Sequence, residues 1–352
     1  MTTPHHDDHP TPAEVAATTE ASIAEAPATE LPSVGVIMPI LNEERHLREA
    51  VQAVLGQDYA GDLHLVLALG PSRDRTDRIA AEICAEQPTV RTVANPSGRT
   101  PEALNAAIAA LGDAQVVVRV DGHGLLAPDY VRTAVELLEE TGAANVGGIM
   151  DAEGVTSFER AVAAAMTSRL GVGGARFHTG GGAGPADTVY LGVFRRSWLT
   201  RLGGYDPRFV RAQDWELNHR IRSAGGLVWF SPRLRVAYRP RPTLAALARQ
   251  YRDYGRWRRV VARTHAGTIN ARYLAPPVAL VGVVAGLVGG LVWWPLWLVP
   301  AAYLALTTVG GLTVRDARLR PEDRLWLPVI LPTMHLCWGW GFVTSTLRLD
   351  DR

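Results

Sequence analysis

The feature that most limits the possible folds is an alternation of short apolar strands and amphipathic helices beginning near residue 33. The strand patterns, rich in Val, Ile and Leu, lie at Val34–Met38, Leu63–Leu69, Val90–Val93 and Val116–Val120. Helical spacing of apolar residues follows the first three strands, at Glu43–Leu55, Asp77–Glu86 and Glu102–Leu111. Repeated strand–helix units form parallel sheets with right-handed crossovers. The sequence therefore predicts an α/β, Rossmann-like fold with a mostly parallel sheet, in which Pro39 ends the first strand.

Polar or glycine-rich loops follow all four strands. These loops are Pro39–Glu44, Gly70–Thr76, Asn95–Thr100 and Asp121–Gly124. The carboxyl ends of parallel strands share one edge of the sheet, and open α/β folds bind their ligands there. Each loop alone also fits a plain connection, but the four together predict a nucleotide-binding cleft.

The fourth loop places an acid and an imidazole two residues apart, as Asp121 and His123 around Gly122. Glycine lets the backbone turn, so both side chains can reach one divalent cation. Taken alone, the tripeptide is more typical of an Asp-Gly turn with a solvated histidine. Beside the other polar loops, it favours metal-assisted phosphate chemistry.

Composition limits the partners and the cellular compartment. The formal net charge of +1 over 352 residues gives no overall basic excess for nucleic-acid binding. The only two cysteines, Cys84 and Cys337, lie far apart, which argues against a disulfide framework. Residues 1–32 are rich in Ala, Thr, Pro and acids without apolar periodicity and predict a disordered tail. No basic stretch precedes an apolar one there, so we expect the following domain to stay in the cytoplasm.

Three apolar segments without a charged residue close the sequence. They are Leu274–Trp293, Leu296–Val314 and Leu325–Thr346, and each is long enough to cross a bilayer. The arginine-rich stretch Val314–Arg324 is expected on the cytoplasmic side. The basic helix predicted at Thr243–Arg263 fits either a solvated surface or the lipid interface. We therefore expect an amphipathic interfacial helix and linker at 242–273, and three transmembrane helices at 274–352.

Several motifs, taken in order, resemble the inverting glycosyltransferases of family 2. Val36–Glu44 is similar to the opening of that family, and Ser72–Thr76 to its second loop. Asn95–Gly98 with Ala103–Asn105 resembles its third element, and Val120–His123 lies where its metal-binding Asp-x-Asp belongs. The likeness covers roughly Ser33 to Arg263 and is greatest to the succinoglycan-biosynthesis-type branch. It implies a GT-A fold at 33–241, a nucleotide-diphosphate sugar as donor, and a divalent metal, Mn²⁺ or Mg²⁺.

The resemblance also implies roles for particular residues. Those expected to contact the nucleotide or its phosphates are Pro39, Asn42, Glu43, Gly98, Arg99, Asn105 and Asp121. Asp121 and His123 are the expected metal ligands, with His123 in place of the second aspartate. Leu69 and Gly70 stand where many members have an acidic pair, which leaves the donor base open.

The stretch Gln213–Leu217 resembles the Glu-Asp motif that supplies the catalytic base in this family, with Gln213 in place of the glutamate. Helical spacing places Asp214 in the first turn of a helix, where an acid can also simply favour the helix dipole. We expect Asp214 to accept the proton of the attacking hydroxyl. Asp253 stands where processive members have the Gln of Gln-x-x-Arg-Trp, so long-chain processive synthesis is not supported.

The run Gly171–Pro185 contains seven glycines. This composition predicts an irregular, mobile loop, which fits a lid over the acceptor or a simple connector.

Together these features predict a membrane-anchored, metal-dependent inverting glycosyltransferase for a lipid-linked or surface-polysaccharide acceptor, as in exopolysaccharide biosynthesis of the cell envelope. We expect a multi-pass cell-membrane protein with a cytoplasmic catalytic domain, whose partners are the nucleotide sugar, the acceptor and membrane lipids, and no nucleic acid. A polyprenyl-phosphate monoglycosyl synthase differs only in the acceptor. Leu69, Gly70 and Gln213 also fit a degenerate, non-catalytic sugar-nucleotide-binding scaffold.

Overall fold

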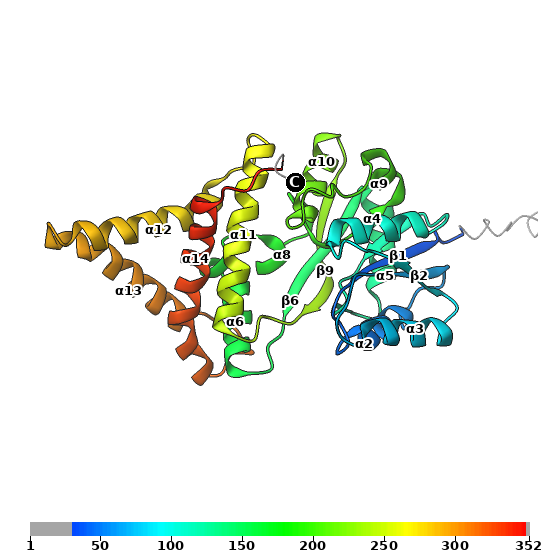
Figure 1. Cartoon of the computed structure of the whole chain (residues 1–352), viewed down its shortest axis with the longest axis horizontal. Helices are drawn as coiled ribbons and strands as arrows, with labels where there is room; N and C mark the ends of the chain where they lie inside the picture. The colour runs from blue at the N-terminus through cyan, green and yellow to red at the C-terminus, as the bar shows by residue number, and fades with distance from the viewer. Residues whose placement is uncertain (1–29, 350–352) are drawn as a thin grey trace, which may run out of the picture. The chain divides into compact units, whose positions relative to one another are not determined.

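A nine-stranded mixed sheet organises this computed structural model, which describes residues 30–349 (Figure 1). The strand order is β3-β2-β1-β4-β8-β6-β9-β5, and β7 pairs with β9. The parallel part comprises β1 (Val34–Ile40), β2 (Leu63–Leu69), β3 (Val90–Ala94) and β4 (Val116–Arg119). The remaining strands are β5 (Leu125–Leu126), β6 (Asn145–Ala152), β7 (Gly184–Pro185), β8 (Tyr190–Arg195) and β9 (Val228–Tyr238). β8 runs antiparallel between β4 and β6, while β6 and β9 are parallel. The predicted α/β fold is confirmed. The predicted tail at 1–32 lies almost wholly outside the described residues.

Helices cover both faces of the sheet because apolar residues alternate along its strands. Val36 and Met38 of β1 belong to one buried cluster, and Ile37 between them belongs to the other. The first face is covered by α2 (Leu47–Leu55), α3 (Thr76–Glu86) and α5 (Tyr130–Thr141). The second is covered by α4 (Thr100–Ala110), α9 (Arg196–Leu202) and α10 (Gln213–Ser223).

The first strand continues through Pro39 to Ile40, contrary to the prediction that the proline ends it. Proline lacks an N–H and usually interrupts a sheet ladder. The nitrogen of Pro39 faces the β4 side, where the ladder has already ended at the pairing of Ile37 with Arg119. On the other side, Ile40 still accepts a hydrogen bond from the Gly70 nitrogen at 2.8 Å. The strand therefore loses no hydrogen bond at the proline.

The glycine-rich run contains more regular structure than its composition predicts. After α6 (Ser157–Thr167) come two one-turn helices, α7 (Arg169–Val172) and α8 (Arg176–Thr179), and then β7. Gly173 and Gly180 follow the two short helices with φ of +69° and +74°, conformations that glycine adopts without strain. β7 pairs with β9, which ties the run to the sheet.

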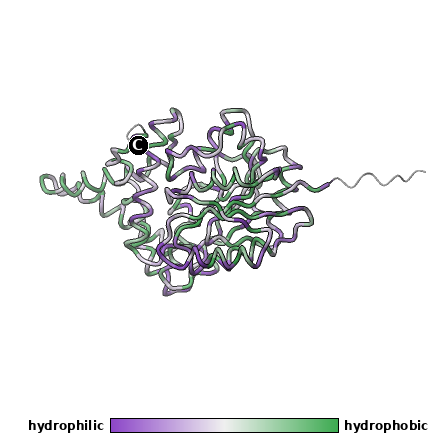
Figure 2. Tube along the Cα trace, turned by 45° about the vertical axis from the view of Figure 1, so that its right-hand side comes forward, coloured by the Kyte–Doolittle hydropathy of each residue, from purple (hydrophilic) through white to green (hydrophobic). Residues whose placement is uncertain are grey.

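The last part of the chain is helical. It comprises α11 (Leu244–Thr264), α12 (Ala271–Gly289), the short η1 (Trp294–Trp297), α13 (Leu298–Leu312), η2 (Glu322–Trp326) and α14 (Leu327–Thr344). In the described part of the chain, two helical segments are long and apolar enough to cross a membrane: α12 and η1–α13. Only 11% and 17% of the most apolar stretch of each segment is buried in the protein. Figure 2, in which hydrophobic residues are green, shows how apolar these segments are along the chain. α14, the third predicted span, is not among the segments that are long and apolar enough to cross a membrane.

α14 packs closely against α11. A Cβ atom on Gly341 of α14 would lie 1.9 Å from the Arg252 carbonyl oxygen of α11, and one on Gly255 of α11 would lie 1.9 Å from the Trp338 oxygen. Only glycine allows two helix backbones to approach so closely. Beyond α14, Arg263 donates to the Leu347 oxygen at 3.1 Å. Both α14 and the segment after it are therefore held against α11.

Candidate active site

The first two loops of the sheet edge are joined by hydrogen bonds. Asn42, in a left-handed conformation with φ of 56°, donates its backbone N–H to Ser72 Oγ at 3.1 Å. Its side-chain oxygen accepts the Arg73 N–H at 2.8 Å. The Glu43 N–H donates to Thr76 Oγ1 at 2.8 Å. These bonds fix the backbone of Asn42 and Glu43 just beyond Ile40, at the carboxyl end of β1.

The third loop approaches the second through Gly98. Gly98 has φ of +66°, and a Cβ there would lie 3.1 Å from Pro71. Asn95 braces the turn by donating to the Arg99 oxygen at 3.2 Å and accepting from Ser97 Oγ at 2.9 Å. The Arg99 side chain is half exposed and lies 3.6 Å from Glu102. Gly98 and Arg99 therefore stand at the same edge of the sheet as Asn42 and Glu43.

Arg119, the last residue of β4, joins the two carboxylates of the site. One Nη donates to Asp121 Oδ1 at 3.0 Å, and the other donates to Asp214 Oδ1. The arginine side chain is only 5% exposed, whereas Asp121 and Asp214 are 25% and 30% exposed. Burial lowers the pKa of Arg119, but the Asp121 carboxylate together with the nearby Tyr205 and Tyr190 outweighs burial, and the net pKa is raised. The structure thus brings together two acids that lie 93 positions apart in the sequence.

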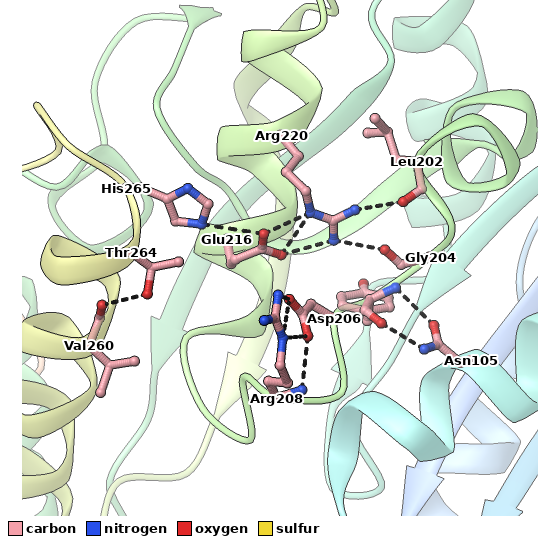
Figure 3. A network of polar contacts seen from close by, with 11 residues as sticks. Asn105, Leu202, Gly204, Asp206, Arg208, Glu216, Arg220, Val260, Thr264 and His265 are labelled. Atoms are coloured by element: carbon pink, nitrogen blue, oxygen red, sulfur yellow. Dashed lines mark hydrogen bonds and ion pairs between the residues drawn. The ribbon is translucent and has the colours of Figure 1, made fainter. Parts of the chain in front are cut away.

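A buried ion pair anchors the first turns of α10, which carry Asp214 (Figure 3). Glu216 is 1% exposed and accepts from Arg220 Nε at 2.7 Å. Arg220 also donates to the backbone oxygens of Leu202 and Gly204, both at 2.8 Å. A bidentate pair that also holds a neighbouring loop fixes the helix in position. Asp214 therefore reaches Arg119 from a rigid support.

Asn105 has a different environment from the other predicted nucleotide contacts. Its amide donates to the Tyr205 oxygen at 2.7 Å and accepts the Tyr205 N–H at 2.8 Å (Figure 3). A Cβ on Gly204 would lie 2.5 Å from the Asn105 side-chain oxygen. Asn105 thus clamps the turn before α10. Tyr205 is buried beside Arg119, and burial raises its pKa to about 12.

His123 pairs with Glu43 across the sheet edge. The distance between His123 Nδ1 and Glu43 Oε1 is 2.8 Å, and this hydrogen bond is the largest cause of the raised pKa of His123. A carboxylate on one ring nitrogen is the usual way that proteins orient a histidine whose other nitrogen binds a metal. His123 Nε2 and Asp121 Oδ2 have no hydrogen-bond partner among the described residues.

A carboxylate oxygen and an imidazole nitrogen are both possible ligands of a divalent metal. No group of three or more His, Cys, Asp or Glu side chains within residues 30–349 is arranged to hold one. The protein would therefore supply two ligands, and phosphate oxygens and water the others, as is usual for metals bound to nucleotides.

The sequence prediction did not include Arg119, Glu216 or Arg220. Arg119 interrupts a run of buried valines, and a charged residue in such a strand requires a buried partner. The sequence therefore indicated that Arg119 has an acidic partner, but it did not indicate which acids these are. Glu216 and Arg220 lie four residues apart on a helix, a spacing shared by many exposed pairs of little consequence.

Comparisons with known proteins place the chain in a family. The model of the Glycosyl transferase family 2 matches residues 35–203. The succinoglycan biosynthesis protein ExoA of Rhizobium meliloti (strain 1021) is 31% identical over 319 residues, which cover 90% of this chain and 96% of ExoA. The chain belongs to glycosyltransferase family 2. A second relative comes from Methanococcus voltae and is 22% identical over 329 residues, which cover 90% of this chain and 97% of that protein. Its name is dolichyl N-acetyl-alpha-D-glucosaminyl phosphate 3-beta-D-2,3-diacetamido-2,3-dideoxy-beta-D-glucuronosyltransferase.

Two solved structures have a similar fold. The mannosyltransferase PcManGT from Pyrobaculum calidifontis, in complex with GDP-Man and Mn²⁺, has a TM-score of 0.63. It is 21% identical, over 92% of this chain and 89% of its own. Residues 1–349 of S. aureus TarS give a TM-score of 0.50 at 14% identity, over 89% and 90% of the two chains. The sheet of this family 2 glycosyltransferase is therefore a GT-A fold.

Proposed function

We propose that this glycosyltransferase is a membrane-anchored, inverting enzyme that transfers a sugar from a nucleotide-diphosphate donor to a lipid-linked or surface-polysaccharide acceptor. The observation that carries the proposal is the pair of hydrogen bonds from Arg119 to Asp121 and Asp214. One carboxylate follows a strand at the ligand-binding edge of the sheet, and the other opens a later helix. Their convergence supports one site with separate groups for the leaving diphosphate and the incoming hydroxyl.

Asp214 is the proposed base. A partly exposed carboxylate accepts the hydroxyl proton of the acceptor as its oxygen attacks the anomeric carbon of the donor. The bond between that carbon and the diphosphate oxygen breaks on the opposite side, so the anomeric configuration inverts. The nucleoside diphosphate leaves with the bonding electron pair.

Asp121 and His123 would hold a divalent metal, which neutralises charge on the leaving diphosphate when bound. A neutral imidazole binds Mn²⁺ more readily than Mg²⁺. Mn²⁺ is also the metal named with PcManGT. Pro39, Asn42, Glu43, Gly98 and Arg99 are proposed to line the nucleotide cleft, and Glu43 also orients His123. Asn105 is proposed to hold the turn before α10 instead, because its amide bonds to the Tyr205 backbone.

The hairpin of α12 and α13 is the proposed membrane anchor. Apart from Arg272 in the first turn of α12, both helices are uncharged and mostly exposed. α12 is about 28 Å long at 1.5 Å per residue, close to the thickness of a hydrocarbon core. Four arginines follow α13, at Arg315, Arg318, Arg320 and Arg324. They support a cytoplasmic position for this end and for the catalytic domain. The basic helix α11 then lies at the lipid interface.

The substitution Asp214→Asn tests the proposal. We expect turnover of a radiolabelled nucleotide sugar in membranes to fall about 100-fold or more, because proton transfer by a positioned base contributes about 10²–10⁴-fold. Thermal stabilisation by donor and Mn²⁺ should persist, which shows that the variant is folded. Equal turnover by both proteins would contradict the role of Asp214.

A polyprenyl-phosphate monoglycosyl synthase remains the second candidate. The Methanococcus voltae relative, by its name, acts on a dolichyl-phosphate-linked sugar, which favours a lipid phosphate in the acceptor. The mass of the product in a lipid extract separates the candidates. A single sugar on a polyprenyl phosphate selects the synthase, and a longer lipid-linked glycan selects the first proposal.

A further inference from the structure

The first turn of α12 carries positive charge that no described acid in contact balances. Arg272 lies in this turn, which has no acidic residue, and Asn270 before it makes no side-chain capping bond. From α11, Arg258 places its guanidinium carbon 3.8 Å from the centre of the Tyr273 ring in the same turn. The N-terminus of a helix is itself partly positive. The guanidinium groups of Arg258 and Arg272 therefore lie together at the N-terminus of α12.

Arg258 is unusual because it is a buried cation without a carboxylate. The residue is 6% exposed and lies between the rings of Trp215, at 4.2 Å, and Tyr273. One Nη donates to the Thr268 oxygen, while Nε has no partner. Burial lowers the pKa of Arg258, and the charge of Arg272 lowers it further. An arrangement that weakens its own cation gains stability when an anion binds.

Arg272 is the more exposed of the two arginines. Its guanidinium carbon lies 4.6 Å from the Tyr273 ring centre, and its Nη2 donates to the Tyr273 hydroxyl at 2.6 Å. The Arg272 Nε has no partner, although the residue is only partly buried. Gly173 of the glycine-rich run lies against it, since a Cβ there would be 3.5 Å from the Arg272 Cβ. The glycine-rich run at 171–185 thus lies beside the cluster formed by Arg258, Arg272 and the first turn of α12.

One acid, Asp187, does attract Arg258, but it is already engaged. It is 60% exposed and lies 4.0 Å from Arg222. Among the described residues, no carboxylate forms an ion pair with Arg258 or Arg272. The positive charge is therefore left for a ligand.

The surroundings identify the chemistry of that ligand. Trp215, which stacks on Arg258, directly follows the proposed base Asp214 in α10. On the other side, exposed apolar side chains run along α12 with helical spacing, at Leu274, Val278 and Val281. A phosphate between the guanidinium groups and the helix end would leave room for a hydrocarbon chain along this face.

We propose that Arg258, Arg272 and the first turn of α12 bind the phosphate of the membrane lipid that carries the acceptor. Guanidinium groups and helix N-termini are both suited to phosphate oxygens. The lipid chain lies along α12, and the acceptor group extends toward Asp214. This inference rests on the proposed function and assigns the acceptor site within it.

Binding of farnesyl phosphate, a short polyprenyl phosphate, tests the inference. Equilibrium dialysis uses the radiolabelled probe with the full chain in detergent, and farnesol and inorganic phosphate serve as competitors. We expect farnesyl phosphate to bind at least about tenfold more tightly than either competitor. Arg272→Gln should weaken its binding by about tenfold or more, because a hydrogen bond to a charged group is lost. Arg258→Met should weaken it as well.

Arg259→Gln is the matched control, because Arg259 neighbours Arg258 on α11 and instead lies 5.1 Å from the Phe342 ring centre. It should leave binding unchanged. Three results would each overturn the inference. Farnesol could bind as tightly as farnesyl phosphate, inorganic phosphate could displace the radiolabelled probe as well as unlabelled farnesyl phosphate does, or Arg272→Gln could bind farnesyl phosphate as tightly as the wild type. Thermal stabilisation by a nucleoside diphosphate with Mn²⁺ is measured on every variant. Its absence in the wild type would count against the proposed function and leave the phosphate site standing.

Discussion

At the scale of single residues, the site depends on one guanidinium between two acids. Arg119→Met removes the cation that holds Asp121 and Asp214 together, and the two negative side chains then repel each other. Because misplacement of a catalytic group by about 1 Å costs up to about 100-fold, we expect kcat to fall about 10- to 100-fold. Steady-state kinetics with the radiolabelled donor measure the change.

Arg119→Lys separates charge from geometry in the same experiment. Lysine keeps the positive charge but lacks the planar fork that reaches two carboxylates, so it should restore only part of kcat. Arg91→Met, at an exposed position of β3, should behave like the wild type. Full activity of Arg119→Met would show that the bridge has no catalytic importance.

In the proposed site, Glu43 would support the metal through His123 rather than by direct contact. Glu43→Gln keeps the shape of the side chain but removes the carboxylate that orients the ring, 2.8 Å from Nδ1. Losing such a partner lowers metal affinity about 10- to 100-fold. Titration with Mn²⁺ in the presence of a nucleoside diphosphate, followed by the electron-spin resonance of free Mn²⁺, measures this affinity. Glu44→Gln is the control, because Glu44 pairs with Arg75 instead.

Residue types were easier to predict than residue partners. Asp121 and Asp214 stood out by their places in motifs, and the structure gives both the same arginine. Asn105 also lay in a motif, but its amide bonds to Tyr205, one hundred positions later. Such a partner depends on how α4 meets the turn before α10. No local pattern of residues contains that information.

At the scale of elements, the contact of α11 with α14 depends on the absence of side chains. A Cβ on Gly341 would lie 1.9 Å from the Arg252 oxygen, whereas one on Gly282 of α12 would be 3.8 Å from Val299. Gly341→Ala should therefore lower the melting temperature of the detergent-solubilised chain, with overpacking costing about 1–3 kcal/mol. Gly282→Ala should leave the melting temperature unchanged or raise it, because alanine favours helices. Equal shifts would contradict the close packing.

Apolar sequence identified the helices at the end of the chain but not their environments. The sequences of α12 and α14 are alike: beyond Arg272 at the start of α12, both are apolar helices with internal prolines and no charged residue. α12 is largely exposed, while α14 buries Leu327, Ile330 and Met334. The difference lies in the neighbour, because α14 packs on α11 and α6. Apolar composition records only that a helix avoids water, and protein or lipid can satisfy that requirement.

At the scale of the whole molecule, the number of membrane crossings follows from what α14 touches. Its partner α11 carries charged residues that cannot enter hydrocarbon at low cost, including Arg249, Arg252, Asp253, Arg256, Arg259 and Arg263. Leu349, after α14, is buried with Phe209 of the catalytic domain. Both ends of α14 are held on the catalytic side, since Asp323 before it pairs with Arg160 at 2.8 Å. We therefore predict two crossings, by α12 and α13, in place of the three expected from apolar segments.

Two crossings return the C-terminus to the side of the catalytic domain, whereas three would leave it on the opposite side. Fusions of alkaline phosphatase and of green fluorescent protein after Arg352, expressed in bacteria, distinguish these arrangements. With two crossings, the fluorescent fusion is bright and the phosphatase fusion inactive, because this phosphatase folds only in an oxidising compartment. Fusions after Trp294, at the turn between the crossings, should give the opposite result. An active phosphatase after Arg352 would mean that α14 crosses the membrane and draws α11 away from its present contacts.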